Sequence, residues 1–219
     1  MTFDVLLPLL WEETGSTLYM TFASTALSYV LGLPLGILLA VTDKNGLLPN
    51  RPINWFFNTA VNILRSAPFL ILMIAALPLT RKILGTTLGS TATVIPLVIA
   101  AFPYVGRLVE SSLKEVDAGM IEAMRSMGAR PHQIILKGLL PEALPSLLTG
   151  ATLATTTILG YGAMAGFIGG GGLGAVAINY GYYRYKYDIM FIALALLIII
   201  VQLIQMAGNA IAHRVDKRQ

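Results

Sequence analysis

Few side chains in this sequence have the types and spacing that chemistry requires. The chain has no Cys and only two His, His132 and His213, which leaves it without thiolate ligands, cysteine nucleophiles or a histidine metal site. Residues 169–172 are four consecutive glycines, but Leu-Gly-Ala follows them rather than the Gly-Lys-Ser/Thr of a phosphate-binding loop. The sequence therefore predicts no metal site, no catalytic residue and no ATP site on this chain.

Polar side chains in one apolar stretch form a stripe. Asn54, Asn58, Asn62 and Arg65 are spaced four, four and three residues apart, so they share one face of a helix. An arginine in lipid costs about 2.5–3.5 kcal/mol on insertion scales, so this face should avoid lipid. Two interpretations stay open: polar contacts between helices, or the border of a translocation pathway with Asn62 and Arg65 as candidate residues.

These residues must be positioned by elements of a very apolar chain. Of its 219 residues, 56% are hydrophobic and 12% are charged, against roughly 25% charged in soluble domains. A globule of this length cannot bury so much apolar surface, which disfavours a soluble enzyme or a nucleic-acid-binding protein. Crossing a hydrocarbon core takes about 20 largely uncharged residues. The uncharged runs predict an all-α polytopic membrane protein, one domain over 1–219, with five transmembrane helices at 16–42, 53–79, 88–110, 143–166 and 189–211.

Two details complete this layout. Glycines weaken helices, so the segment from 169 to 183 is predicted to be a loop. Ser24, Ser28, Gly32, Gly36 and Ala40 recur every four residues in the first span, a ridge that allows close helix packing either within the chain or across a dimer.

The basic residues predict the orientation in the membrane. Lys114, Arg125, Arg130 and Lys137 place the loop 111–141 in the cytoplasm, and Arg214, Lys217 and Arg218 place the C-terminus there too. Counting back three spans leaves the N-terminus outside, in a first apolar run that lacks signal-peptide features and is expected to be retained. Tyrosines between 180 and 187 are then expected to anchor the outer membrane interface.

The fourth predicted span is rich in hydroxyl groups and small residues. Thr152 and Thr156 lie on it, and this composition suits the lining of a pore better than a lipid-facing surface. At its outer end, Tyr161 and Met164 offer bulky groups with which two chains could close a gate. Core packing is the alternative interpretation of the same residues.

The loop 111–141 is patterned as two short helices. Asp117 suits an N-cap, Gly128 can end the first helix, and Pro131 suits the first turn of a second helix that carries Ile134. Periodicity alone leaves two interpretations open: an amphipathic hairpin resting on lipid, or a docking surface for another protein.

A resemblance favours docking. The spacing Glu122-Ala123-x4-Gly128-x5-Ile134-x6-Pro141 resembles the EAA motif of ABC-importer permeases, with Met124 in place of the motif's third small residue. Segments 65–69, 159–174 and 179–183 resemble the methionine-import permeases of bacteria. The resemblance implies a type I ABC-importer permease fold, with a coupling-helix hairpin in which Glu122, Ala123, Gly128, Ala129, Ile134 and Pro141 serve ATPase coupling.

The same resemblance implies the function and the partners. It implies a non-catalytic permease subunit of an ATP-driven importer in the bacterial inner membrane, which translocates methionine of D or L configuration by alternating access. The implied partners are a second copy of the chain, a dimer of separate ATP-binding subunits that use ATP and Mg²⁺, and an extracytoplasmic methionine-binding protein or lipoprotein.

Other transport functions remain as alternatives. The first is an ABC permease for another amino acid or small solute. An ion-coupled secondary transporter is disfavoured because intramembrane acids are nearly absent: Glu110 sits at a helix end, three residues from its expected partner Arg107.

Overall fold

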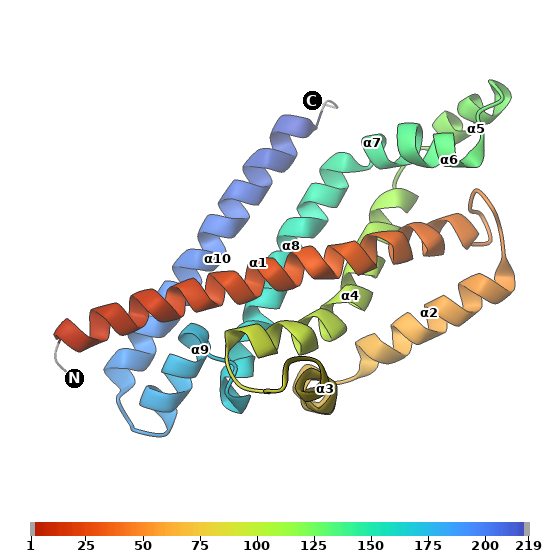
Figure 1. The fold of residues 1–219 in the computed structure, drawn as a ribbon. Helices are drawn as coiled ribbons and strands as arrows, with labels where there is room; N and C mark the ends of the chain where they lie inside the picture. Colours follow the sequence, from red (N-terminus) through yellow and green to blue (C-terminus); the bar gives the residue numbers. More distant parts are fainter. Residues whose placement is uncertain (1–2, 217–219) are drawn as a thin grey trace. The chain divides into compact units, whose positions relative to one another are not determined.

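The structure, a computed structural model, describes residues 3–216, and within that range it is helical with short turns and no strand. The helices are α1 (Phe3–Thr42), α2 (Arg51–Ser66), α3 (Phe69–Leu84), α4 (Ser90–Lys114), α5 (Ala118–Ser126), α6 (Pro131–Ile134), α7 (Leu140–Glu142), α8 (Leu144–Ala165), α9 (Gly172–Val176) and α10 (Tyr187–Val215) (Figure 1). Two π-helical segments, Ile135–Leu139 and Ala177–Tyr182, and a 3₁₀ turn at Gly166–Ile168 join neighbouring helices. Lys217 and Arg218, used above for the orientation, lie outside the described residues.

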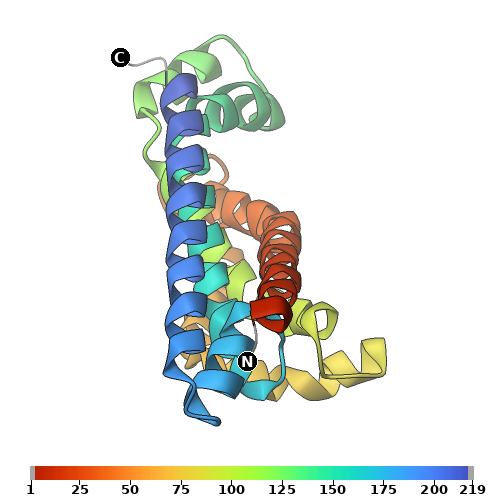
Figure 2. The same cartoon turned by 90° about the vertical axis from the view of Figure 1, so that its left-hand side faces the viewer.

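Four stretches are long and apolar enough to cross a membrane, in agreement with the all-helical membrane fold expected from the sequence. They are Val5–Thr42 of α1, the whole of α4, Leu144–Ile168 beginning with α8, and the whole of α10. Figure 2 shows α10 as one uninterrupted helix. A fifth span is reached if α2 and α3 together count as one. The helix α1 begins at Phe3, before the expected residue 16, because Glu12 and Glu13 interrupt the apolar run but are good helix formers.

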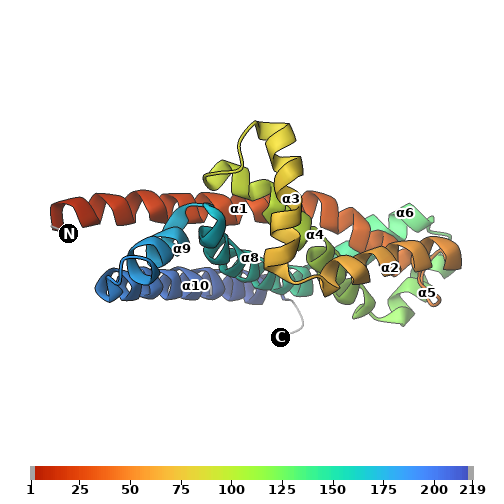
Figure 3. The ribbon, with the colours of Figure 1, turned by 90° about the horizontal axis from the view of Figure 1, so that it is seen from below.

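The single helix expected over 53–79 is wrong, because the chain forms two helices there. The first ends at Ser66 and the second begins at Phe69, so α2 and α3 appear as separate helices in Figure 3. Pro68 explains the break: it has no amide hydrogen and disfavours helical geometry in the residue before it. Pro68 itself is extended, with φ −58° and ψ 129°, and serves as the N-cap of α3.

The chain forms two compact units. The first unit contains Met1–Ser28, Ala67–Ala101 and Ala154–Gln205, and the second contains Tyr29–Ser66, Phe102–Leu153 and Met206–Gln219. The core of the first unit joins α1, α8, α9 and α10 through the buried residues Leu6, Leu10, Leu159, Leu173, Val176, Ile189, Ala193 and Ile200.

In the second unit, the C-terminal half of α1 packs against α4 at very short range. A Cβ atom at Gly32 would lie 2.6 Å from Cγ1 of Val105, and one at Gly36 would lie 2.5 Å from Cβ of Val109. The glycines of the small-residue ridge are therefore used for packing within the chain, where close backbone approach gives dispersion contacts.

The glycine-rich segment after α8 is largely helical, so the prediction of a loop over 169–183 is wrong. Glycine is needed there for contact between backbones: a Cβ atom at Gly174 would lie 2.5 Å from Cα of Ala163, and one at Gly166 would lie 2.5 Å from the Ala175 nitrogen. Helix propensity counts only the local cost of a glycine, whereas here the glycines allow α8 and α9 to touch.

Candidate coupling and translocation sites

The hairpin after α4 forms as the sequence predicts. Oδ1 of Asp117 accepts hydrogen bonds from the amides of Gly119 at 2.8 Å and Met120 at 3.3 Å, which caps the N-terminus of α5. Gly128 follows α5 with φ +79°, a left-handed conformation that glycine adopts without strain. Pro131 opens α6, and the side chain of Gln133 accepts from the Arg130 amide at 2.8 Å.

The two halves of the hairpin pack through methionine. A Cβ atom at Gly138 would lie 2.6 Å from the sulfur of Met124 and 3.3 Å from that of Met120. Ile134, 1% exposed, lies in a cluster with Val41 and Leu47. The thioethers of Met120 and Met124 thus occupy the space that a side chain at position 138 would need. This close packing fixes the angle between the two halves of the hairpin.

The sequence-predicted coupling residues divide into a surface set and an internal set. Glu122, Ala123, Gly128 and Pro141 are exposed, Ala129 is half-buried, and Ile134 is buried. Met127, which the motif does not include, is 78% exposed at the end of α5. The hairpin therefore presents an exposed face for a partner, while Ile134 holds it to the rest of the second unit.

The polar stripe of α2 is met by an arginine from α4. Arg107 donates through Nη2 to Oδ1 of Asn58 and to Oδ1 of Asn62, the latter at 2.7 Å. Its Nη1 pairs at 2.5 Å with Glu110, which confirms the partner expected from the sequence. Asn54 donates to the Leu39 carbonyl at 2.9 Å. All three asparagines thus make polar contacts between helices, which is the first of the two interpretations given above. The sequence did not predict that Arg107 of α4 would be the partner of Asn58 and Asn62.

Arg65 differs from the rest of the stripe. It lies in the last turn of α2, its side chain is exposed, and residues 3–216 provide it with no hydrogen bond or ion pair. The carbonyl groups at a helix C-terminus favour a positive charge there. Arg65 is consequently an exposed cation that pairs with no acidic side chain among residues 3–216.

The fourth-span candidates lie in different surroundings. Thr152 is buried and donates to the Leu148 carbonyl at 3.0 Å. It packs against Gly208 of α10, where an added Cβ atom would lie 2.6 Å from the Thr152 methyl group. Thr156 is half-buried. Tyr161 stacks on Phe69 with ring centroids 4.0 Å apart and planes 10° apart. Met164 is 47% exposed near the end of α8. Tyr161 and Met164 thus remain on accessible parts of the first unit, whereas Thr152 faces α10.

Side chains from α1 hold the glycine-rich segment in the first unit. Glu13 accepts from the amide of Gly172 at 2.6 Å, and Thr17 accepts from that of Leu173 at 2.9 Å, so both cap the start of α9. Thr93 donates to the Gly170 carbonyl at 3.2 Å. Sequence reasoning missed these contacts because their partners lie far apart in the chain, by 77 residues for Thr93 and by more than 150 for Glu13 and Thr17.

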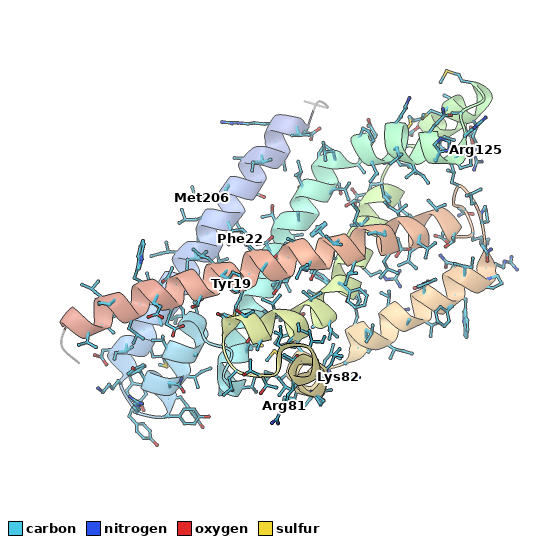
Figure 4. All side chains as sticks on the ribbon, in the orientation of Figure 1. Tyr19, Phe22, Arg81, Lys82, Arg125 and Met206 are labelled. Carbon is cyan, nitrogen blue, oxygen red and sulfur yellow. The ribbon has the colours of Figure 1, made fainter. Side chains whose placement is uncertain are left out.

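A second missed group anchors the end of α1. Nζ of Lys114 lies 2.5 Å from Asp43 and 2.8 Å from Glu110. The hydrogen bond from Lys114 holds the pKa of the Asp43 carboxyl below its usual value. Arg125 on α5, labelled in Figure 4, donates to the Leu47 carbonyl at 2.9 Å. The turn after α1 is therefore connected both to α4 and to the hairpin.

Within residues 3–216, four helices long and apolar enough to cross a membrane, together with the capped hairpin after α4, define a polytopic helical membrane protein. A sequence model for the binding-protein-dependent transport system inner membrane component matches residues 32–219. The chain belongs to this family, and it is therefore a multi-pass inner-membrane permease component rather than an enzyme.

Individual relatives are similar over nearly the full chain. The probable D-methionine transport system permease protein MetI of Vibrio cholerae is 51% identical, over 98% of this chain and 94% of its own. The protein of the same name from Pasteurella multocida is 45% identical, over 96% and 99%. A solved structure described as an inward-facing conformation of the MetNI methionine ABC transporter matches 99% of this chain and 100% of its own with a TM-score of 0.97 and 44% identity.

Proposed function

We propose that this chain is the permease subunit of an ATP-driven ABC importer that carries methionine, of D or L configuration, into the cell. The identity of 51% to a D-methionine transport permease, over 98% of this chain, carries the proposal. The match to a chain of the MetNI methionine ABC transporter supports it. Two copies of the chain would work by alternating access with two ATP-binding subunits, which use ATP and Mg²⁺, and with an extracytoplasmic methionine-binding protein or lipoprotein.

Reconstitution tests the proposal. The complex of this chain with its ATP-binding subunit, placed in liposomes with the cognate binding protein, should accumulate radiolabelled methionine only when ATP is present on the ATPase side. Uptake without the ATPase would contradict an ABC importer. ATP-dependent uptake of a different amino acid, with methionine neither imported nor competing, would replace methionine as the substrate.

The exposed face of the hairpin supports a role in binding the ATP-binding subunit. Glu122, Ala123, Gly128 and Pro141 would contact that subunit, while Ala129 and Ile134 hold the hairpin in shape. Glu122→Ala should weaken co-purification of the ATPase without changing the thermal stability of the permease, because Glu122 is exposed. Unchanged co-purification and unchanged ATP-dependent transport would remove Glu122 from this role.

Arg65, Asn62, Thr156, Tyr161 and Met164 remain the proposed pathway or gate residues. Arg65 carries the largest part of this proposal, because an exposed arginine of a membrane-spanning region avoids lipid only by facing water or another subunit. Arg65→Ala should lower methionine transport while assembly and ATP hydrolysis persist. A variant with normal transport would show that Arg65 does not border the pathway.

Met164 provides the test of the gate. The chain has no cysteine, so Met164→Cys introduces a single thiol. Cross-linking between the two copies should depend on the nucleotide bound to the ATPase if Met164 closes the gate on the shared axis. Cross-linking that is independent of nucleotide would indicate packing instead. Of the pathway and gate candidates predicted from the sequence, Thr152 has the least support, because its side chain is buried against Gly208.

A further inference from the structure

We infer that the turn between α1 and α2, residues 43–50, is the internal seat of the coupling hairpin, and that Arg125 is a positioning residue that fixes the hairpin to this seat. The inference rests on the proposed coupling function of the hairpin. It assigns a role to a turn that carries none of the family motif residues. All the contacts that support it lie within the second unit.

The turn has a well-defined backbone. The amide of Gly46 donates to the Asp43 carbonyl at 2.9 Å, that of Leu48 to Val41 at 2.9 Å, and that of Asn50 to Thr42 at 3.0 Å. A Cβ atom at Gly46 would lie 2.5 Å from the Ala40 carbonyl oxygen, so no other residue fits there without moving the backbone. The turn therefore folds back onto the end of α1 and presents Leu47 in a fixed position.

Leu47 is the apolar part of the seat. It is 8% exposed and lies in a cluster with Val41 of α1 and Ile134 of α6. Ile121 and Met124 of α5 pack against the same cluster. Leu47 thus belongs to a cluster against which both helices of the hairpin pack, and this cluster holds the hairpin against the end of α1.

Arg125 is the polar part of the seat. Its Nη2 donates to the carbonyl of Leu47 at 2.9 Å, and a hydrogen bond from a charged donor is stronger than one between neutral groups. A cavity of about 400 Å³ borders the same place and is lined by Gly46, Leu47, Glu122 and Arg125 among others. Because this side is open rather than packed, no neighbouring side chain would replace the bond if the guanidinium were removed.

The seat is itself tied to three helices. Asp43 of the seat pairs with Lys114 at the end of α4. Oδ1 of Asn50 accepts from the Ile53 amide of α2 at 3.2 Å, and the Asn50 amide donates to the Thr42 carbonyl at the end of α1. A displacement of the hairpin would therefore reach α1, α2 and α4 through residues 43–50. Arg125 would position the hairpin for this transfer without contacting the substrate.

The experiment compares variants on each side of the contact in the complete complex with its ATP-binding subunit. Arg125→Ala removes the donor, and Gly46→Ala displaces the acceptor carbonyl while Arg125 remains. Both should raise the ATP hydrolysed per methionine imported. Both should also increase amide hydrogen exchange in residues 118–126 by roughly 10- to 100-fold, the range expected for loss of a hydrogen bond from a charged group. Arg125→Lys, which keeps a donor, should restore slower exchange.

Lys137→Ala is the matched control, because Lys137 is an exposed basic residue of the same hairpin without a hydrogen bond or ion pair in residues 3–216. Its exchange in 118–126 should be unchanged. If Arg125→Ala and Gly46→Ala act on one contact, the double variant should resemble the single ones. Additive effects, or an effect of Arg125→Ala alone, would overturn the inference and indicate that Arg125 acts directly on the ATPase.

The two readouts separate this inference from the proposed function. If the wild-type complex transports no methionine but Arg125→Ala still loosens residues 118–126, the seat is real and the proposed substrate is wrong. If methionine is transported but exchange in Arg125→Ala equals that of the wild type, the seat is wrong. Should Gly46→Ala not assemble, the comparison of Arg125→Ala with Arg125→Lys decides alone.

Discussion

Glu110 is a buried carboxylate between two cations. It is 4% exposed and accepts from Arg107 at 2.5 Å and from Lys114 at 2.8 Å. The two cations reach outward to different partners, Arg107 to the asparagines of α2 and Lys114 to Asp43. Glu110 therefore holds the two cations that connect α4 to α2 and to the turn after α1. Because Glu110 is buried, loss of its negative charge should destabilise the fold.

Replacing Glu110 should destabilise the protein. Glu110→Gln leaves two cations close together without the carboxylate, and breaking a buried ion pair costs about 3 kcal/mol. We expect a clear loss of Tm for the purified permease and lower expression. Glu12→Gln is the control, since Glu12 is exposed on α1 and should leave Tm unchanged. Equal Tm values for the two variants would contradict a structural role for Glu110.

The Asp43–Lys114 pair should make stability depend on pH in the acid range. The folded state holds the pKa of Asp43 below its usual 3.8, because Lys114 donates a hydrogen bond to it. Its contribution to stability is therefore present above the unfolded pKa and is lost as pH falls through the folded value. Thermal unfolding should differ between wild type and Asp43→Asn at pH 7, and the difference should shrink as the pH falls below 3.8. A difference that stays constant as the pH is lowered further would assign the effect to another group.

Local chemistry was predictable from the sequence where partners lie close along the chain. The cap by Asp117, the turn at Gly128 and the pair of Arg107 with Glu110 all involve residues within a few positions of each other. Contacts from Arg107 to Asn58 and from Glu13 to Gly172 were not predictable, because periodicity places a residue on a face but does not identify what covers that face.

At the scale of elements, the glycines decide how closely helices approach. Gly32 and Gly36 bring α1 against α4 in the second unit, and Gly166 and Gly174 bring α8 against α9 in the first. The sequence indicated the first of these contacts by its four-residue repeat. It did not indicate the second, because a run of glycines resembles a flexible loop. Pro68 indicates the break between α2 and α3, but the prediction of one span over 53–79 considered only the spacing of charged residues.

The packing of α1 on α4 can be tested with a matched pair of glycines on the same helix. A Cβ atom at Gly36 would lie 2.5 Å from Cβ of Val109, whereas Gly15 has no atom within 4 Å of such a position. Gly36→Ala should destabilise the permease by about 1–3 kcal/mol through overpacking. Gly15→Ala should be neutral or slightly stabilising, because alanine favours a helix. Comparison of Tm values checks both, and a neutral Gly36→Ala would contradict this packing.

For the whole molecule, the charge distribution and the lengths of the uncharged runs predicted the fold class. The apolar fraction and the charge gaps predicted an all-helical membrane protein, and the family match places the chain in the inner membrane. The orientation stays a prediction of the positive-inside rule. Arg81 and Lys82 at the end of α3 are the basic residues expected outside between the second and third spans (Figure 4).

A pair of lysines tests the orientation. Lys82→Cys and Lys44→Cys each introduce the single thiol of the chain, and both positions are exposed. With the N-terminus outside, a membrane-impermeant maleimide should label Lys82→Cys in intact spheroplasts, and Lys44→Cys only after permeabilisation. The reverse pattern would invert the topology.

The break at Pro68 has a consequence for biosynthesis. With 16 residues each, α2 and α3 are about 24 Å long at 1.5 Å per residue, less than the roughly 30 Å of a hydrocarbon core. Asn58 and Asn62 of α2 accept from Arg107 of α4, which the ribosome makes later. We therefore expect residues 51–84 to complete their membrane insertion only after α4 has emerged, as a late and cooperative step of biosynthesis.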